Sequence, residues 1–195
     1  MIAQKQQEWE QIAARFYTAT DKIGMRIDSG ILETVIALNV LGIETSASCE
    51  GHLDHGVGEP WIDIEVISAY EQVRHVAQMF TCADTARKQQ TLPDAEIDVL
   101  FEEAWREQKR VKAIYLEQRA KLMKYLAAFY AMRQVPYDRI IAIHPRDTAG
   151  RARLESIGAD LQLIVSPAIR EQNLAEYQQE MQAFTAFMKH IYFSA

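Results

Sequence analysis

One short glycine-rich loop gathers several side chains that can bind a metal ion or transfer a proton. Cys49, His52 and His55 recur there at regular intervals, in the pattern C-x-x-H-x-x-H. Thiolate and imidazole groups are ligands that zinc-class metals prefer. The spacing therefore predicts a divalent metal site, such as zinc, formed by Cys49, His52 and His55, with a fourth position open or filled from elsewhere. The alternative is a structural loop, in which glycines allow a tight backbone path while His52 and Asp54 form hydrogen bonds within it.

The same loop offers groups for acid–base or nucleophilic catalysis. Because an imidazole titrates nearest to neutral pH, we expect His52 to be the acid or base of an enzyme, oriented by Glu50 or Asp54. Cys49 is a candidate nucleophile if His52 or His144 lowers the pKa of its thiol. A cysteine beside a strand also serves as a small hydrophobic core residue, which is the non-catalytic alternative.

A third interpretation is a pocket for a nucleotide or another small anion. Hydroxyl side chains precede the loop, a glycine lets backbone N–H groups approach a ligand, and two arginines further along the chain lie two residues apart. Residues two apart on a strand share a face, so this pair could jointly hold a phosphate or carboxylate. The expected ligand-binding residues are Thr45, Ser48, Gly51, Asp54, Arg151 and Arg153. In the structural alternative, the arginines form surface ion pairs with Asp147, Glu155 or Asp160.

The loop and its flanks resemble segments of two groups of proteins. The segment from Asn39 to His52 reads N-x-x-G-I-x-T-x-x-S-C-E-G-H and resembles a loop of small uncharacterised bacterial and phage proteins. Residues 28–67 are also similar to the wybutosine-synthesis tRNA methyltransferase family, in which a helix ending in L-N precedes T-x-S-S-C-x-G-R and a strand. The matching residues are Leu38, Asn39, Thr45, Ser48, Cys49 and Gly51, whereas Ala47 and His52 differ. This resemblance implies an α+β core whose loop lines a ligand pocket, with S-adenosylmethionine as cofactor.

Hydrophobic periodicity predicts short helices and strands around this loop. Strands are expected at 23–27, 43–48, 61–67, 139–143, 151–157 and 161–165. Helices are expected at 3–19, 29–41, 69–81 and 167–191, the second with Asp28 or Ser29 as N-cap and Gly42 after its last turn. The polar residues 83–92 are typical of a linker. The fold class that follows is α+β, a small mixed sheet with packing helices.

Residues 93–135 are predicted to form a long helical arm or insertion. No proline or glycine occurs between Pro93 and Pro136, and the apolar residues follow a heptad pattern. At 1.5 Å per residue, about 40 helical residues span roughly 60 Å, more than the diameter of a globule of this size. We therefore expect a homodimer through this helix, with a break near Gln108 into two antiparallel helices as the alternative. In the competing functional class, the protein is a non-enzymatic dimeric interaction protein and the loop is a structural turn.

The composition is that of one ordinary globular domain spanning residues 1–195. Of these residues 49% are hydrophobic and 25% are charged, and the net charge of −6 disfavours binding to duplex nucleic acid. Neither a signal peptide nor an apolar stretch of about 18 residues is present, so we expect a cytoplasmic protein without a membrane span. In a reducing cytosol, Cys49 and Cys82 are expected to be free thiols.

Overall fold

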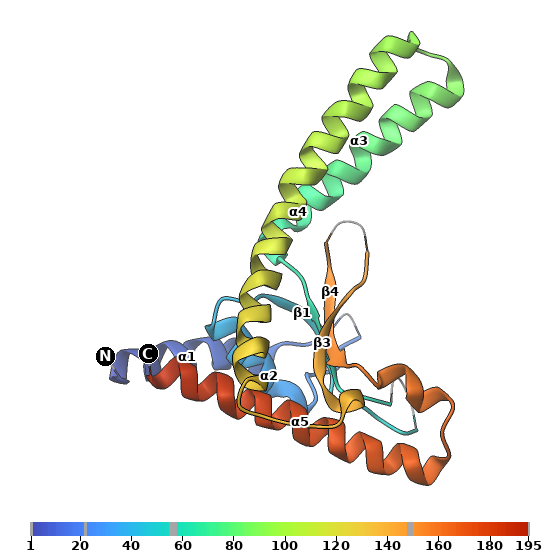
Figure 1. Ribbon diagram of the computed structural model, residues 1–195. Coiled ribbons are helices and arrows are strands. Elements are labelled where there is room, and N and C mark those ends of the chain that lie inside the picture. Colours follow the sequence, from blue (N-terminus) through green and yellow to red (C-terminus); the bar gives the residue numbers. More distant parts are fainter. Residues whose placement is uncertain (1, 22, 55–57, 148–149, 195) are drawn as a thin grey trace.

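A four-stranded sheet carries the loop, and helices cover one of its faces (Figure 1). The computed structural model describes residues 2–21, 23–54, 58–147 and 150–194. The strands are β1 (Thr45–Cys49), β2 (Trp61–Ile64), β3 (Ile141–Pro145) and β4 (Ala152–Ser156), in the spatial order β1-β2-β4-β3. The helices are α1 (Ile2–Thr18), α2 (Ser29–Val40), α3 (Tyr70–Gln89), α4 (Asp94–Tyr130) and α5 (Pro167–Ser194). The α+β fold is confirmed, although every strand pair is antiparallel, so the sheet is not mixed.

The alternation of side chains along the strands decides which face of the sheet is buried. Ile62 and Ile64 of β2 and Leu154 of β4 are almost completely buried, in one apolar cluster with residues of α2 and α5. Asp63 lies between Ile62 and Ile64, and Arg153 lies between the buried residues Ala152 and Leu154. Because side chains alternate along a strand, Asp63 and Arg153 point to the opposite, open face. Helix α2 is buried on most of its surface, which explains why its sequence is apolar on nearly every side.

Helix α4 is a single helix of 37 residues, about 55 Å long, and its upper part leaves the body of the protein (Figure 1). Its last turns join the main core through Leu122 and Phe129. Further up, Val111 and Tyr115 pack against Val76 of α3, which runs back along α4. The predicted long arm is confirmed, whereas the break near Gln108 is wrong. Because α3 of the same chain covers this part of the apolar seam, the seam alone does not require a second subunit.

The predicted linker over 83–92 is wrong for most of its length. Helix α3 continues to Gln89, and the small residues Ala83 and Ala86 are buried in the helical hairpin that α3 and α4 form. The segment is polar because most of its other residues face solvent. A polar exterior with small buried residues is typical of a two-helix arm. The same polar composition is also typical of linkers, which is why the sequence predicted one here.

Two predicted strands are also absent from the sheet that the described residues form. The segment 161–165 lies largely in a 3-10 helix (Ala159–Leu163), and Leu163 is 82% exposed, so its apolar residues line no buried face. The segment 23–27 contributes one isolated bridge, between Thr20 and Arg26. Among the described residues, no helix has both the length and the apolar character needed to span a lipid bilayer.

Candidate functional site

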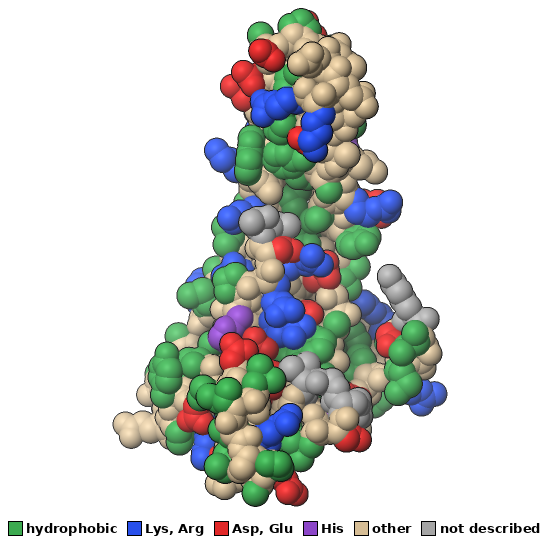
Figure 2. Space-filling model, turned by 90° about the vertical axis from the view of Figure 1, so that its right-hand side faces the viewer, with side chains coloured by type: hydrophobic (Ala, Val, Ile, Leu, Met, Phe, Trp, Pro, Cys, Tyr) green, Lys and Arg blue, Asp and Glu red, His purple; other side chains and the backbone are tan. Residues whose placement is uncertain are grey.

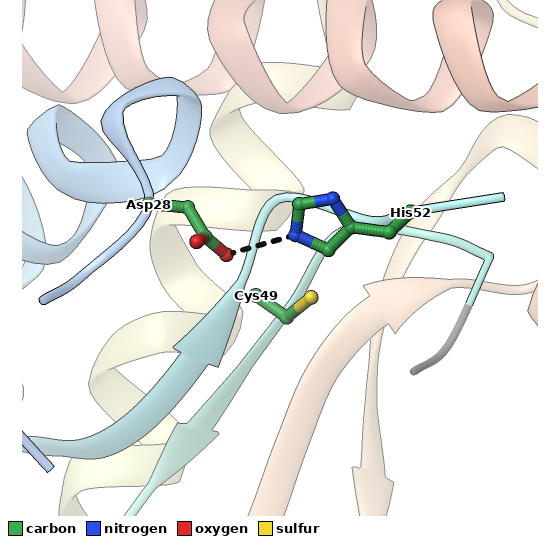
Figure 3. Close-up of side chains that lie close together, drawn as sticks. All are labelled: Asp28, Cys49 and His52. Atoms are coloured by element: carbon green, nitrogen blue, oxygen red, sulfur yellow. Dashed lines mark hydrogen bonds and ion pairs between the residues drawn. The ribbon is translucent and has the colours of Figure 1, made fainter. Parts of the chain in front are cut away.

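Three side chains with metal-binding atoms converge where β1 ends and α2 begins (Figure 3). The Sγ atom of Cys49, a ring nitrogen of His52 and a carboxylate oxygen of Asp28 all lie within 4.8 Å of one another, and all three residues are half-buried. Cys49 is the last residue of β1, His52 follows in the next turn, and Asp28 directly precedes α2. The sequence predicted Cys49 and His52 as ligands, whereas the third predicted ligand, His55, lies outside the described residues.

Asp28 occupies the N-cap position of α2, as predicted, but its side chain forms no capping hydrogen bond to that helix. Instead, its Oδ2 atom accepts a hydrogen bond from the backbone N–H of Glu50, at 3.1 Å. The same oxygen lies 3.3 Å from Nε2 of His52, at hydrogen-bond distance. One carboxylate therefore orients both the turn after β1 and the imidazole ring.

Glu50 supplies the helix cap that Asp28 does not provide. Its Oε2 atom accepts the backbone N–H of Gly30 in the first turn of α2, at 2.6 Å. Its backbone carbonyl accepts a hydrogen bond from the Nε2 group of Gln178 in α5, at 2.9 Å. The sequence predicted a catalytic or orienting role for Glu50, which stays a prediction; in the structure Glu50 connects the loop to α2 and α5.

Gly51 adopts a backbone conformation that L-amino acids rarely adopt, with a φ of +86°. A Cβ atom at this position would lie 2.7 Å from the backbone of Glu59 and 2.7 Å from the side chain of Leu174. Its N–H points back to Sγ of Cys49, at 3.3 Å. Gly51 thus permits the close packing of the loop and helps to orient the thiol.

The surroundings of Cys49 do not favour an activated nucleophile. Burial raises the pKa of the Cys49 thiol, the N–H of Gly51 lowers it in part, and the nearby carboxylates of Asp28 and Glu50 raise it again. The thiol is therefore protonated at neutral pH when no cation is close to it. The Nε2 atom of His52 meanwhile faces Asp28.

The predicted hydroxyl ligands lie along β1 rather than at the Asp28–Cys49–His52 cluster. Thr45 is buried, and its Oγ1 atom accepts a hydrogen bond from Nδ2 of Asn39 at 2.9 Å, so it joins α2 to β1. Ser48 lines a separate groove beside β1. Asp54 is exposed in the loop after His52.

The two predicted anion-binding arginines are paired with carboxylates of the same chain. Arg153 forms two hydrogen bonds with Asp63, at 2.7 and 2.9 Å, and its guanidinium lies 3.7 Å from the ring centre of Trp61. Arg151 pairs with Asp147 at 2.5 Å, as the structural alternative proposed. Figure 2 looks onto this side of the molecule and shows acidic and basic side chains side by side below the arm, rather than a continuous basic patch.

Glu59, at the far end of the loop, is an unusual buried acid. Its side chain is only 5% exposed, and burial raises the pKa of Glu59 to about 7. The carboxylates of Glu155 and Asp160 act in the same direction, whereas Arg153 and Arg170 lower the pKa. This residue therefore changes its charge near neutral pH, which the sequence alone did not indicate.

No protein-family model, curated protein or solved structure matches this chain. The local resemblances of the loop are therefore untested, and the function has to be inferred from the geometry of the site.

Proposed function

We propose that the protein binds a zinc-class divalent metal ion through Asp28, Cys49 and His52, with a fourth coordination position for water or a small ligand. The observation that supports this proposal is the convergence of one sulfur, one nitrogen and one oxygen donor within 4.8 Å. These donors come from two segments that two hydrogen bonds hold together, one from the N–H of Glu50 to Asp28 and one from the N–H of Gly30 to Glu50. These hydrogen bonds would hold the ligand side chains in position in the metal-free protein.

The spacing of two of these donors fits a shared ion. In a tetrahedral zinc site with metal–nitrogen and metal–oxygen distances of about 2.0–2.1 Å, neighbouring donors are about 3.3 Å apart. Nε2 of His52 and Oδ2 of Asp28 are separated by 3.3 Å. A metal ion could therefore replace the contact between them without a large movement of either side chain.

The chemistry of the donor set indicates the class of metal. Thiolate and imidazole ligands favour zinc-class ions, whereas magnesium and calcium prefer all-oxygen sites. One thiolate and one carboxylate together neutralise a divalent cation. Three protein ligands with one open position are typical of catalytic rather than structural zinc sites. A bound ion of this class acts as a Lewis acid and acidifies a coordinated water molecule.

Metal analysis of protein purified without a histidine tag tests the proposal. We expect about one equivalent of a zinc-class metal per chain, and a content below roughly a tenth of an equivalent contradicts the proposal. With cobalt as a spectroscopic substitute, thiolate ligation by Cys49 should produce a charge-transfer band. Cys49→Ser should abolish this band, whereas Cys82→Ser should retain it, because Cys82 is a free, exposed thiol on α3.

Two further variants separate loss of the metal from loss of the fold. Asp28→Asn keeps an oxygen that can accept the N–H of Glu50 but loses the negative charge. It should therefore fold normally and bind zinc roughly 100-fold more weakly. His52→Gln should behave in the same way, with His190→Gln on the exposed side of α5 as its control. Equal zinc affinity of the His52 and His190 variants would exclude His52 as a ligand.

A further inference from the structure

Strand β1 lies at one edge of the sheet and borders a groove. In the order β1-β2-β4-β3, β1 pairs with β2 on one side only. Its other side faces residues 19–21 and 25–27, and the space between them is a groove of about 560 Å³. Residues lining it include Phe16, Met25, Ile27, Ser48, Trp61 and Ile67. The volume lies within the range of ordinary ligand sites.

The unpaired edge of β1 limits what can fill this groove. Among the residues that the structure describes, no backbone hydrogen bond joins the outer edge of β1 to another segment. Such an edge presents alternating N–H and C=O groups at strand spacing. An extended polypeptide matches that pattern along its whole length, so the chemistry of the edge favours a peptide over a small molecule.

The side chains of β1 are small, and those around the groove include exposed apolar ones. Natural edge strands are often protected by lysine, proline or a β-bulge. Strand β1 reads T-S-A-S-C and has neither lysine nor proline; its pairing with β2 is irregular between Thr45 and Ala47, but Ala47 itself is exposed. Two large apolar residues that line the groove are also exposed to solvent: Met25 at 63% and Ile67 at 52%. Alternate apolar side chains of an added strand would bury both.

We propose that β1 binds an extended segment of a partner protein as an added strand, with apolar side chains at alternate positions lying in the groove. Ile27 and Ser48 line the groove, and the next residues in the chain are Asp28 and Cys49. One end of the bound segment therefore lies at the candidate metal site. This last placement rests on the proposed function, whereas strand addition at β1 does not.

Peptides that bind the protein can be selected from a phage library that displays random nonapeptides, with the full chain as the target. The expected peptides have alternating apolar residues. The backbone register is then tested by N-methylation of each amide of a selected peptide in turn, with affinity measured by fluorescence polarisation. In an added strand only every second residue faces β1, so methylation should weaken binding at alternate positions, by about three- to tenfold per hydrogen bond lost. A selection that enriches no peptide, or methylation effects without this alternation, would overturn the proposal.

Matched substitutions locate the binding site. Met25→Asp places a charge in the groove and should reduce affinity at least tenfold. Ile23→Asp is its control, since Ile23 is 84% exposed and is not among the residues lining the groove. Ala47→Lys should block pairing at the edge itself, while Ala47→Ser should bind normally. Equal binding by Met25→Asp and Ile23→Asp would contradict the groove as the site.

Two further measurements distinguish peptide binding at β1 from metal binding and from self-association. His52 lies outside β1 and is not among the residues that line the groove, so His52→Gln should retain peptide affinity even if it loses metal, and failure of the metal proposal and failure of this one are distinguishable. If Ala47→Lys instead dissociates a concentration-dependent dimer of the unmodified chain and no peptide competes with that dimer, the occupant is a second copy and the proposed partner is wrong.

Discussion

The side chains of Asp28 and Glu50 form reciprocal hydrogen bonds, each with a backbone N–H at or near the other residue. The carboxylate of Asp28 accepts the N–H of Glu50, and the carboxylate of Glu50 accepts the N–H of Gly30, two residues after Asp28. The start of α2 and the turn after β1 are thereby joined by two charge-assisted hydrogen bonds, which are stronger than neutral ones. This arrangement releases Asp28 from its capping role and directs its carboxylate towards His52.

Removal of the Glu50 carboxylate should destabilise the protein rather than remove a catalytic group. Glu50→Ala leaves the N–H of Gly30 without its cap, which should lower the free energy of unfolding by about 1–2 kcal/mol. Glu50→Gln should cost less, because the amide oxygen can still accept this hydrogen bond. Urea denaturation measures both, with Glu103→Ala on the exposed side of α4 as control. An unchanged stability of Glu50→Ala would contradict the structural role.

The comparison of sequence and structure is most informative at Asp28. Local residue preferences predicted that Asp28 is the N-cap of α2 and that the helix ends before Gly42. Both predictions are confirmed, and Gly42 has a φ of +72°. The proximity of Asp28 to Cys49 depends on how α2 packs beside β1, which no spacing in the sequence encodes. The clustering of Cys49 and His52 was therefore predictable, but the approach of Asp28 to them was not. Similarly, the two-residue spacing of Arg151 and Arg153 was visible, but their carboxylate partners are set by tertiary packing.

Gly51→Ala should be more damaging than Gly58→Ala. The positive φ of Gly51 costs an alanine about 1–2 kcal/mol, and its Cβ would also clash with the backbone of Glu59 at 2.7 Å. A Cβ on Gly58 would meet a side-chain nitrogen of Arg170 at 3.6 Å, which is an ordinary contact. Thermal denaturation should rank the two variants in this order. Similar melting temperatures would mean that the loop can rearrange around Gly51.

The raised pKa of Glu59 predicts a specific pH dependence of stability. Because the folded protein holds this proton more tightly than the unfolded chain, its contribution is complete below the ordinary pKa and is lost as the pH rises through about 7. A shift of this size corresponds to a loss of about 3 kcal/mol between pH 4 and pH 8. Glu59→Gln should remove that decline and be more stable than the parent at pH 8. Denaturation across this pH range, with Glu103→Gln as control, tests the sign; parallel curves for parent and variant would contradict it.

Arg153 should contribute to stability rather than to anion binding. Its side chain is 11% exposed, and it bridges Asp63 and Trp61, so Arg153→Gln should cost about 1–3 kcal/mol. Arg151 is 51% exposed, so Arg151→Gln should cost less than about 1 kcal/mol. Denaturation gives both values, and thermal-shift assays with ATP or S-adenosylmethionine test the anion pocket. A ligand shift that Arg153→Gln abolishes without a change in stability would restore the anion-binding interpretation.

The predicted homodimer through α4 now has a defined surface on which to test it. Tyr115 and Leu122 are 1% and 0% exposed within the chain, so charged substitutions there would disrupt the fold itself. Trp105, Leu116 and Met123 are exposed instead, at 55%, 45% and 58%. Leu116 and Met123 follow Trp105 by 11 and 18 residues, close to three and five helical turns, so all three share one side of α4.

This shared side predicts which substitutions separate the two subunits. Sedimentation velocity of the unmodified chain should show a dimer, and the double variant Trp105→Glu with Leu116→Glu should be a folded monomer. Val99→Glu is a matched control, because Val99 is 51% exposed but lies six residues from Trp105 and therefore on a different side of the helix. It should remain dimeric. A dimer with a micromolar Kd would be almost fully formed at a protein concentration of about 100 μM. If the unmodified protein is a monomer at that concentration, the predicted homodimer through α4 is wrong.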